Sequence, residues 1–180
     1  MGIDRTQRDP TVDKNQSSLP DSLHLDEIDL QILQELQQNS SAPLHELAEK
    51  VGLSKTPCQR RIKRMEKEGI IQRYVAILNP EALEVDVDVF INVRLYDQTL
   101  RTMKQFRKII LTMPEIVECY VMTGVFDFFL HVRIAGVKAY NEFMQEKLLQ
   151  IPGIAQTQSS ISLERLKYST ALPIVRPRRQ

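Results

Sequence analysis

A short cationic segment carries the clearest chemistry in this 180-residue sequence. Residues 53–69 read LSKTPCQRRIKRMEKEG and hold six Lys or Arg against two Glu, which is a net charge of +4 in a chain whose total is +1. On a helix, residues spaced i, i+3, i+4 and i+7 share one face. Here that spacing collects hydroxyl, amide, guanidinium and ammonium groups on Thr56, Gln59, Arg60 and Lys63. These groups bind base edges and phosphates, so the segment predicts contact with duplex DNA.

The individual side chains suggest distinct roles on DNA. Arg60 suits a bidentate contact to guanine and Gln59 a contact to adenine, while Arg61 and Arg64 flank them at angles suited to phosphates. The opposite side of the helix carries Cys58, Ile62 and Met65 and is expected to pack inward. The predicted DNA-binding set is Ser54, Lys55, Thr56, Gln59, Arg60, Arg61, Lys63 and Arg64.

The alternative is that this cationic helix is simply a solvated face, as most Lys- and Arg-rich helices are. Three features favour the DNA interpretation. Gly52 permits a sharp turn just before the helix, Pro57 suits its first turn, and no acidic residue occurs before Glu66.

Two further helices are expected before the cationic one. Apolar residues recur at helical spacing from Leu25 to Leu36, with Asp26 placed to cap the helix and Asp29 in its first turn. A short second helix follows Pro43 and ends near Gly52.

The cationic helix is expected to begin at Ser54, which can act as its cap, and to stop at Gly69. Two helices joined by a glycine-containing turn form a helix-turn-helix. The segment IIQRYVAIL, residues 70–78, is rich in β-branched residues and predicts a strand that ends at Asn79-Pro80.

The second half of the chain repeats one pattern. Helix-like residues 98–112 lead through Met113-Pro114 into strand-like 117–122, and helix-like residues 137–150 lead through Ile151-Pro152 into strand-like 155–163. A strand precedes each helix, at Val87–Tyr96 and Phe126–Ile134. The order β-α-β occurs twice, which predicts an α+β chain with a ferredoxin-like second domain.

These strands are apolar at more than alternate positions, which predicts burial on both faces of the sheet. Helices cover only one face of such a sheet. Because no other segment is available within the chain, a second copy is the expected cover, and a homodimer or larger assembly follows.

The expected domains follow the changes in composition. Residues 1–23 lack apolar periodicity and are expected to form a flexible arm. A helix-turn-helix domain over 24–72, a strand and hinge over 73–84, and a ferredoxin-like sensing and oligomerisation domain over 85–180 complete the chain.

Composition argues against other classes of protein. No apolar run is long enough to cross a membrane and no secretory signal opens the chain, so a cytoplasmic location is expected. Cys58 and Cys119 have no metal-ligand spacing and are expected to be buried apolar residues. His24, His45 and His131 belong to no catalytic signature, so neither enzyme activity, a cofactor nor a metal site is predicted.

The motifs resemble the leucine-responsive and asparagine-type (Lrp/AsnC) family of transcription regulators over about residues 25–175. The resemblance rests on LDEIDLQIL, GLSKTPCQRRIKRMEKEGII, Leu78-Asn79-Pro80, Gly124 with Phe126-Asp127, and IPGI, in family order and spacing. It implies a winged helix-turn-helix joined by a hinge to a ferredoxin-like effector domain. It also implies dimers that assemble into tetramers or octamers on double-stranded DNA.

The family resemblance further implies a small effector, usually an amino acid, bound between dimers. The matching positions are Val89, Val121, Thr123, Gly124, Asp127, Val137, Ser160 and Ser162. An Asp there suits an α-amino group, and the backbone near Gly124 suits a carboxylate.

One departure from the family leaves two functions open. Val125 stands where the family commonly has an acid. Asp127 is therefore either an effector ligand or a turn residue that holds the local fold. Correspondingly, the chain is either an effector-responsive regulator or an architectural DNA-binding protein without an effector.

Overall fold

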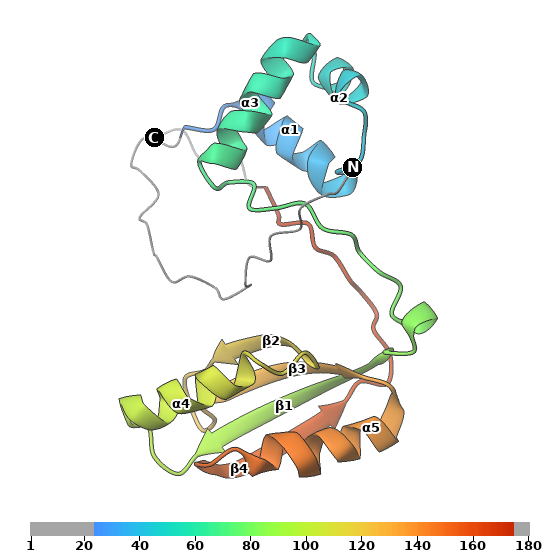
Figure 1. Ribbon diagram of the computed structural model, residues 1–180. Coiled ribbons are helices and arrows are strands. Elements are labelled where there is room, and N and C mark those ends of the chain that lie inside the picture. The colour runs from blue at the N-terminus through green and yellow to red at the C-terminus, as the bar shows by residue number, and fades with distance from the viewer. Residues whose placement is uncertain (1–23, 175–180) are drawn as a thin grey trace, which may run out of the picture. The chain divides into compact units, whose positions relative to one another are not determined.

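The computed structural model describes residues 24–174, which divide into two compact units (Figure 1), and the arm expected over residues 1–23 lies outside the described residues. We call residues 24–77 together with 167–174 the helical domain, and residues 78–166 the sheet domain. Within the described range, no helix combines the length and apolar character needed to cross a bilayer.

The first helix, α1 (Glu27–Gln38), begins at the predicted cap. The Asp29 amide donates to Asp26 Oδ1 at 2.8 Å, and the Asp26 amide donates to Asp29 Oδ2 at 3.2 Å. This reciprocal pair satisfies two amides that a helix start leaves without partners. The expected capping role of Asp26 is confirmed.

Helices α2 (Leu44–Lys50) and α3 (Lys55–Lys67) follow as expected. Gly52, between them, has a φ of +68°, a conformation that favours glycine. Ser54 occupies the cap position of α3, but its side chain makes no capping hydrogen bond, and Pro43 precedes α2 without one either. The two helices therefore depend on packing more than on their caps.

The strand predicted over residues 70–78 is wrong. The amides of Ile70 and Ile71 both donate to the Met65 carbonyl, at 2.9 and 3.1 Å, and so close the end of α3. The rest of the segment has no hydrogen-bonded strand beside it in the described chain. β-Branched composition favours an extended backbone, but a strand also requires a partner.

The C-terminal segment of the helical domain is held by one amide side chain on α1. Gln37 Nε2 donates to the Leu172 carbonyl at 3.3 Å, and the Leu172 amide donates to Gln37 Oε1 at 2.6 Å. This two-bond clamp joins residues 135 positions apart. The helical domain is thus built from two distant parts of the chain.

The sheet domain has the predicted double β-α-β order. Its strands are β1 (Val87–Leu95), β2 (Ile116–Val121), β3 (Phe128–Ile134) and β4 (Ile154–Ile161). Its helices are α4 (Leu100–Ile110) and α5 (Gly136–Glu142), with a short 3-10 helix, η1 (Glu81–Leu83), before β1. After α5 the helical path continues through a π-helical turn, η2 (Phe143–Lys147), and a 3-10 turn, η3 (Leu148–Gln150).

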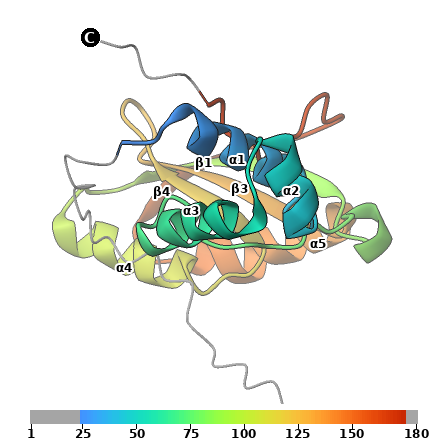
Figure 2. The same cartoon turned by 90° about the horizontal axis from the view of Figure 1, so that it is seen from above.

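The four strands form one antiparallel sheet in the order β2-β3-β1-β4, which confirms the ferredoxin-like prediction. Helices α4 and α5 lie on the same face of this sheet (Figures 1 and 2). Alternate residues of the central strands pack beneath them, so Val89 lies opposite Val132 and Ile91 opposite Leu130 in a fully buried core. Phe106 of α4 packs against Phe128 with the two rings tilted and their centroids 4.4 Å apart.

The other face of the sheet is only partly buried. Phe90 and Phe129 stack there with centroids 5.8 Å apart, and Tyr120 lies beside Phe129. Neither α4 nor α5 covers these rings. Burial was predicted for both faces of the sheet, but within this domain only the face beneath α4 and α5 is fully buried. Cys119, expected to be buried, is exposed on the edge strand β2, because that strand has a neighbour on one side only.

Candidate nucleic-acid interface and effector site

Packing within the helical domain determines which side of α3 is exposed. Cys58 and Met65 of α3 are fully buried, and Ile62 is partly buried against the same core. They pack with residues of α1, α2 and the turn after α2: Ile32, Leu47, Ala48 and Val51. The inward face predicted from helical spacing is confirmed, so the opposite face points to solvent.

The predicted arc of α3 is exposed. Thr56, Gln59, Arg60 and Lys63 are all exposed, as are Ser54 and Lys55 before them. Among the described residues, none of these side chains has a hydrogen-bond or ion-pair partner. Their donors are therefore available to an external partner, although contact with DNA stays a prediction for each of them.

Arg61 and Arg64, also predicted to contact DNA, have partners within the domain. Arg61 Nη1 lies 2.8 Å from Asp29 Oδ1 and 2.6 Å from Asp26 Oδ2. Arg64 Nη2 lies 2.5 Å from Asp29 Oδ2. The hydrogen bond to Asp29, followed by the one to Asp26, raises the pKa of Arg61. The two arginines thus tie α3 to the start of α1.

Sequence reasoning missed the role of Asp29 in this cluster. Its side chain is 1% exposed, which is unusual for an unpaired carboxylate and explained by two guanidinium partners. The helix dipole accounts for an acid in the first turn of α1, but not for its burial. The sequence feature that could have predicted this burial is the pair Arg61 and Arg64, which lie three positions apart on α3 and can both reach one acid.

Asp127, the central predicted effector residue, is buried and already bonded. The Leu95 amide donates to its Oδ2 at 2.7 Å, and Gln98 Nε2 donates to its Oδ1 at 2.6 Å. The Asp127 amide also donates to the Val93 carbonyl at 2.9 Å. These bonds fasten the start of β3 to the end of β1, so Asp127 holds the local fold whether or not it also binds a ligand.

The other predicted effector residues do not meet in one chain. Val121, Thr123 and Gly124 lie at the exposed end of edge strand β2, whereas Ser160 and Ser162 lie at the other edge, on or just after β4. Three strand spacings separate these edges, roughly 14 Å. Any pocket that uses both groups needs a second copy of the chain.

Two further members of the predicted effector set differ in exposure. Val137, at the start of α5, is 70% exposed and available for contact. Val89 is fully buried in the core beneath the helices and presents no surface. We therefore assign Val89 to packing of the sheet.

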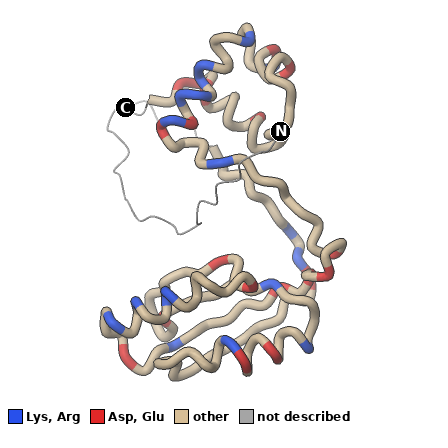
Figure 3. Tube along the Cα trace, in the orientation of Figure 1, with Lys and Arg blue, Asp and Glu red and all other residues tan. Residues whose placement is uncertain are grey.

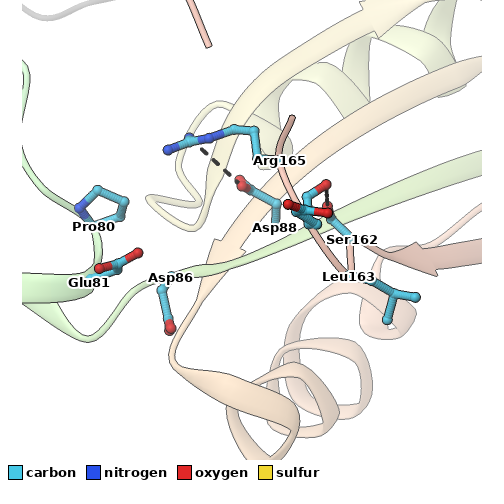
Figure 4. Close-up of a pocket in the computed structure, with 8 residues that line it drawn as sticks. Pro80, Glu81, Asp86, Asp88, Ser162, Leu163 and Arg165 are labelled. Atoms are coloured by element: carbon cyan, nitrogen blue, oxygen red, sulfur yellow. Dashed lines mark hydrogen bonds and ion pairs between the residues drawn. The ribbon is translucent and has the colours of Figure 1, made fainter. Parts of the chain in front are cut away.

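A hollow of about 340 Å³ lies beside Asp88 (Figure 4). Four carboxylates and one guanidinium are among its lining residues, which are Pro80, Glu81, Asp86, Asp88, Ser162, Leu163, Glu164 and Arg165. This excess of negative charge would repel the carboxylate of a free amino acid. The hollow shares only Ser162 with the predicted effector set.

Asp88 is the most strongly bonded acid of that hollow. Its Oδ1 lies 2.7 Å from Arg133 Nε and 2.6 Å from His131 Nε2. Its Oδ2 lies 3.9 Å from Arg165 Nη1. Burial favours the neutral acid, but the bonds from Arg133 and His131 outweigh it and hold the pKa of Asp88 below its ordinary value. Asp88 is therefore a structural carboxylate that braces β1 against β3.

Comparison with protein families assigns both domains. A model described as winged helix-turn-helix DNA-binding matches residues 25–72. A second model, described as Lrp/AsnC ligand binding domain, matches residues 88–172.

Named relatives match over most of their length. The leucine-responsive regulatory proteins of Escherichia coli K12 and Klebsiella pneumoniae are each 38% identical over 150 residues, which cover 83% of this chain and 92% of each relative. A transcriptional regulator from Neisseria meningitidis, solved as a complex with L-methionine, has a TM-score of 0.80 at 35% identity. An AsnC-family regulator from Agrobacterium tumefaciens has the same TM-score at 38% identity. Each structural match covers 83% of this chain and 97% of the other.

Proposed function

Because the chain belongs to the Lrp/AsnC family of transcriptional regulators, we propose that it binds operator DNA through α3 and that a small effector, an amino acid, modulates this binding or the assembly. The observation that carries the proposal is the exposed arc of α3, whose donors have no partner among the described residues. Such a regulator acts in the cytoplasm, where it meets chromosomal DNA. The proposal includes no catalytic role.

The proposed direct contacts are the exposed members of the predicted set: Ser54, Lys55, Thr56, Gln59, Arg60 and Lys63. Arg60 and Gln59 are assigned to base edges, and the lysines to phosphates or bases. Arg61 and Arg64 are assigned mainly to holding α3 against α1, because their guanidinium groups already bind Asp29. Proper orientation of α3 would then depend on those two arginines.

The proposed assembly is a homodimer that forms tetramers or octamers. The half-buried aromatic rings on the open face of the sheet support it, since water contact with such rings is unfavourable. The distance between the two groups of effector positions gives further support. A ligand held between copies would change how the DNA-binding heads are spaced, and so which operators are engaged together.

An architectural protein without an effector is the second candidate. Two observations favour it. Val125 is 71% exposed at a turn where the family commonly has an acid, and the carboxylate of Asp127 is already bonded within the fold. A multimer would still bind DNA tightly through many cationic contacts.

Selection of genomic DNA fragments by the full-length protein, with and without single amino acids, tests the proposed function. A regulator is expected to enrich a limited set of fragments with a shared motif, and an effector is expected to change that set. Enrichment without any shared motif, unaffected by every amino acid, would support the architectural protein instead.

The effector role of Asp127 is tested by thermal unfolding with L-methionine and the other common amino acids. A ligand at 100 times its Kd stabilises the folded state by about 2.7 kcal/mol, so the wild-type melting temperature is expected to rise by a few degrees. Asp127→Asn is expected to abolish the rise, because the amide cannot pair with an ammonium group as a carboxylate does.

Gln98→Ala is the matched control for Asp127. It removes the bond from Gln98 to Asp127 Oδ1 but keeps the carboxylate and its bond from the Leu95 amide, so the rise is expected to persist. Equal loss of response in both variants would show that Asp127 acts through the fold alone. A wild type that responds to no amino acid would count against an effector of this class.

A further inference from the structure

A second helix, α4, carries the same net charge as the segment around α3. Its eleven residues, LRTMKQFRKII, contain four Lys or Arg and no Asp or Glu, a net charge of +4. The whole chain has a net charge of only +1. Figure 3 shows these cations recurring along α4.

Packing directs three of the four cations to solvent. Arg101, Lys104 and Lys108 have the spacing i, i+3 and i+7, which places them along one face of the helix. All three are exposed, whereas Phe106 and Ile110 are buried in the core of the sheet domain. We call Arg101, Lys104 and Lys108 the α4 stripe.

The stripe is not neutralised within the domain. Among the described residues, none of its three side chains has an ion pair. The segment of α5 and η2, on the same face of the sheet, differs because its lysines have acidic partners. Lys138 Nζ lies 3.8 Å from Glu142 Oε1, and Lys147 pairs with Glu115. A helix with an ordinary solvated face interleaves both signs of charge, as that segment does.

Helix stability does not account for the stripe either. Cations favour the last turn of a helix, which explains Lys108. Arg101 lies in the first turn, where the helix dipole disfavours positive charge. Like charges one turn apart also repel, so the stripe costs the isolated domain some stability.

We propose that the α4 stripe is a second contact for DNA, one that binds the phosphate backbone without reading bases. Seven residues of helix span about 10 Å, and duplex DNA presents one negative charge per about 1.7 Å of its axis. The stripe therefore meets several phosphates at once. The proposal rests on the DNA-binding function proposed for α3 and adds a backbone contact from the sheet domain.

The test compares the full-length wild type with the triple variant Arg101→Gln, Lys104→Gln and Lys108→Gln. Affinity for a selected operator, on a minimal duplex and on one with long flanks, is measured over a series of salt concentrations. The slope of log K against log salt changes by about 0.9 for each phosphate that the protein no longer neutralises, so a decrease of up to about 2.7 per engaged stripe is expected. Base preference is expected to stay unchanged.

Two variants keep this test interpretable. Lys138→Gln removes a cation that is already paired on α5 and is expected to leave the slope unchanged. Lys104→Gln alone is expected to lower the slope by about 0.9 per engaged stripe, and it provides a result should the triple variant fold poorly.

Two outcomes would overturn the proposal. In the first, the triple variant matches the wild type in affinity and slope while Arg60→Ala weakens binding, which would reject α4 and keep α3 as the interface. In the second, sedimentation shows altered assembly while DNA binding per chain is unchanged, which would make the stripe a surface between copies. If neither the α3 variants nor the α4 variants change binding, the proposal that the protein binds operator DNA through α3 is wrong together with the proposal for α4.

Discussion

Arg60→Ala is expected to weaken binding to a selected operator by about 1–3 kcal/mol, roughly 5- to 150-fold. Arg60 is exposed in the N-terminal half of α3, the part of a second helix-turn-helix helix that reaches base edges. Its guanidinium has no partner among the described residues, so the substitution breaks no internal bond. Fluorescence anisotropy at fixed salt, on the operator and on point-substituted operators, measures the effect.

Lys63→Ala separates two kinds of contact. If Lys63 reads a base, its removal weakens operator binding as Arg60→Ala does. If Lys63 meets phosphate, binding falls alike on all sequences and the salt slope drops by about 0.9 for each phosphate left without its lysine.

Lys50→Ala controls for net charge in both experiments. It also removes one positive charge from the helical domain, but Lys50 lies on α2 and pairs with Glu35 at 2.6 Å. Its effect is expected to be small. Unchanged operator affinity in Arg60→Ala and in Lys63→Ala would remove α3 from the interface.

Asp29→Ala is expected to destabilise the helical domain by about 2–4 kcal/mol, because it removes the buried acid of an ion-pair cluster. Removing one member of a buried ion pair typically costs about 3–5 kcal/mol, because the remaining charge stays unpaired. Water can rehydrate Arg64, whose side chain is 41% exposed, which lowers the expected cost. Hydrogen exchange of amides in α1 and α3 of the full-length protein measures the change domain by domain.

Glu35→Ala is the matched control for Asp29. Both acids lie on α1, but Glu35 meets a single lysine that is 60% exposed, and a surface pair of this kind contributes little to stability. Similar decreases in protection in the two variants would mean that the cluster of Asp29, Arg61 and Arg64 contributes no more than an ordinary surface pair.

Local patterns predicted most of the fold. Asp26 caps α1, Gly52 and Gly69 have positive φ, and the double β-α-β order gives the observed sheet. Each of these features depends on residues close in sequence or on a repeated period. The incorrect strand over residues 70–78 shows the limit, since composition indicated an extended backbone but not whether a partner lay beside it.

The bonds around the candidate sites were less predictable. Asp29 lies 35 positions from Arg64, and Asp127 lies 32 positions from Leu95. No local pattern specifies such pairs, because they depend on how helices and strands meet. The exposed arc of α3 was predictable for the opposite reason, since helical spacing alone separates it from Cys58 and Met65.

The clamp between Gln37 and Leu172 determines the order in which the helical domain can be completed during synthesis. A ribosome synthesises α1 before the sheet domain, and the backbone that Gln37 binds is added 135 residues later. The three helices have time to pack co-translationally, before the sheet domain exists. Residues 167–174 can dock only after the whole sheet domain has been synthesised, so closure of this clamp waits for the domain that separates its two halves in the chain.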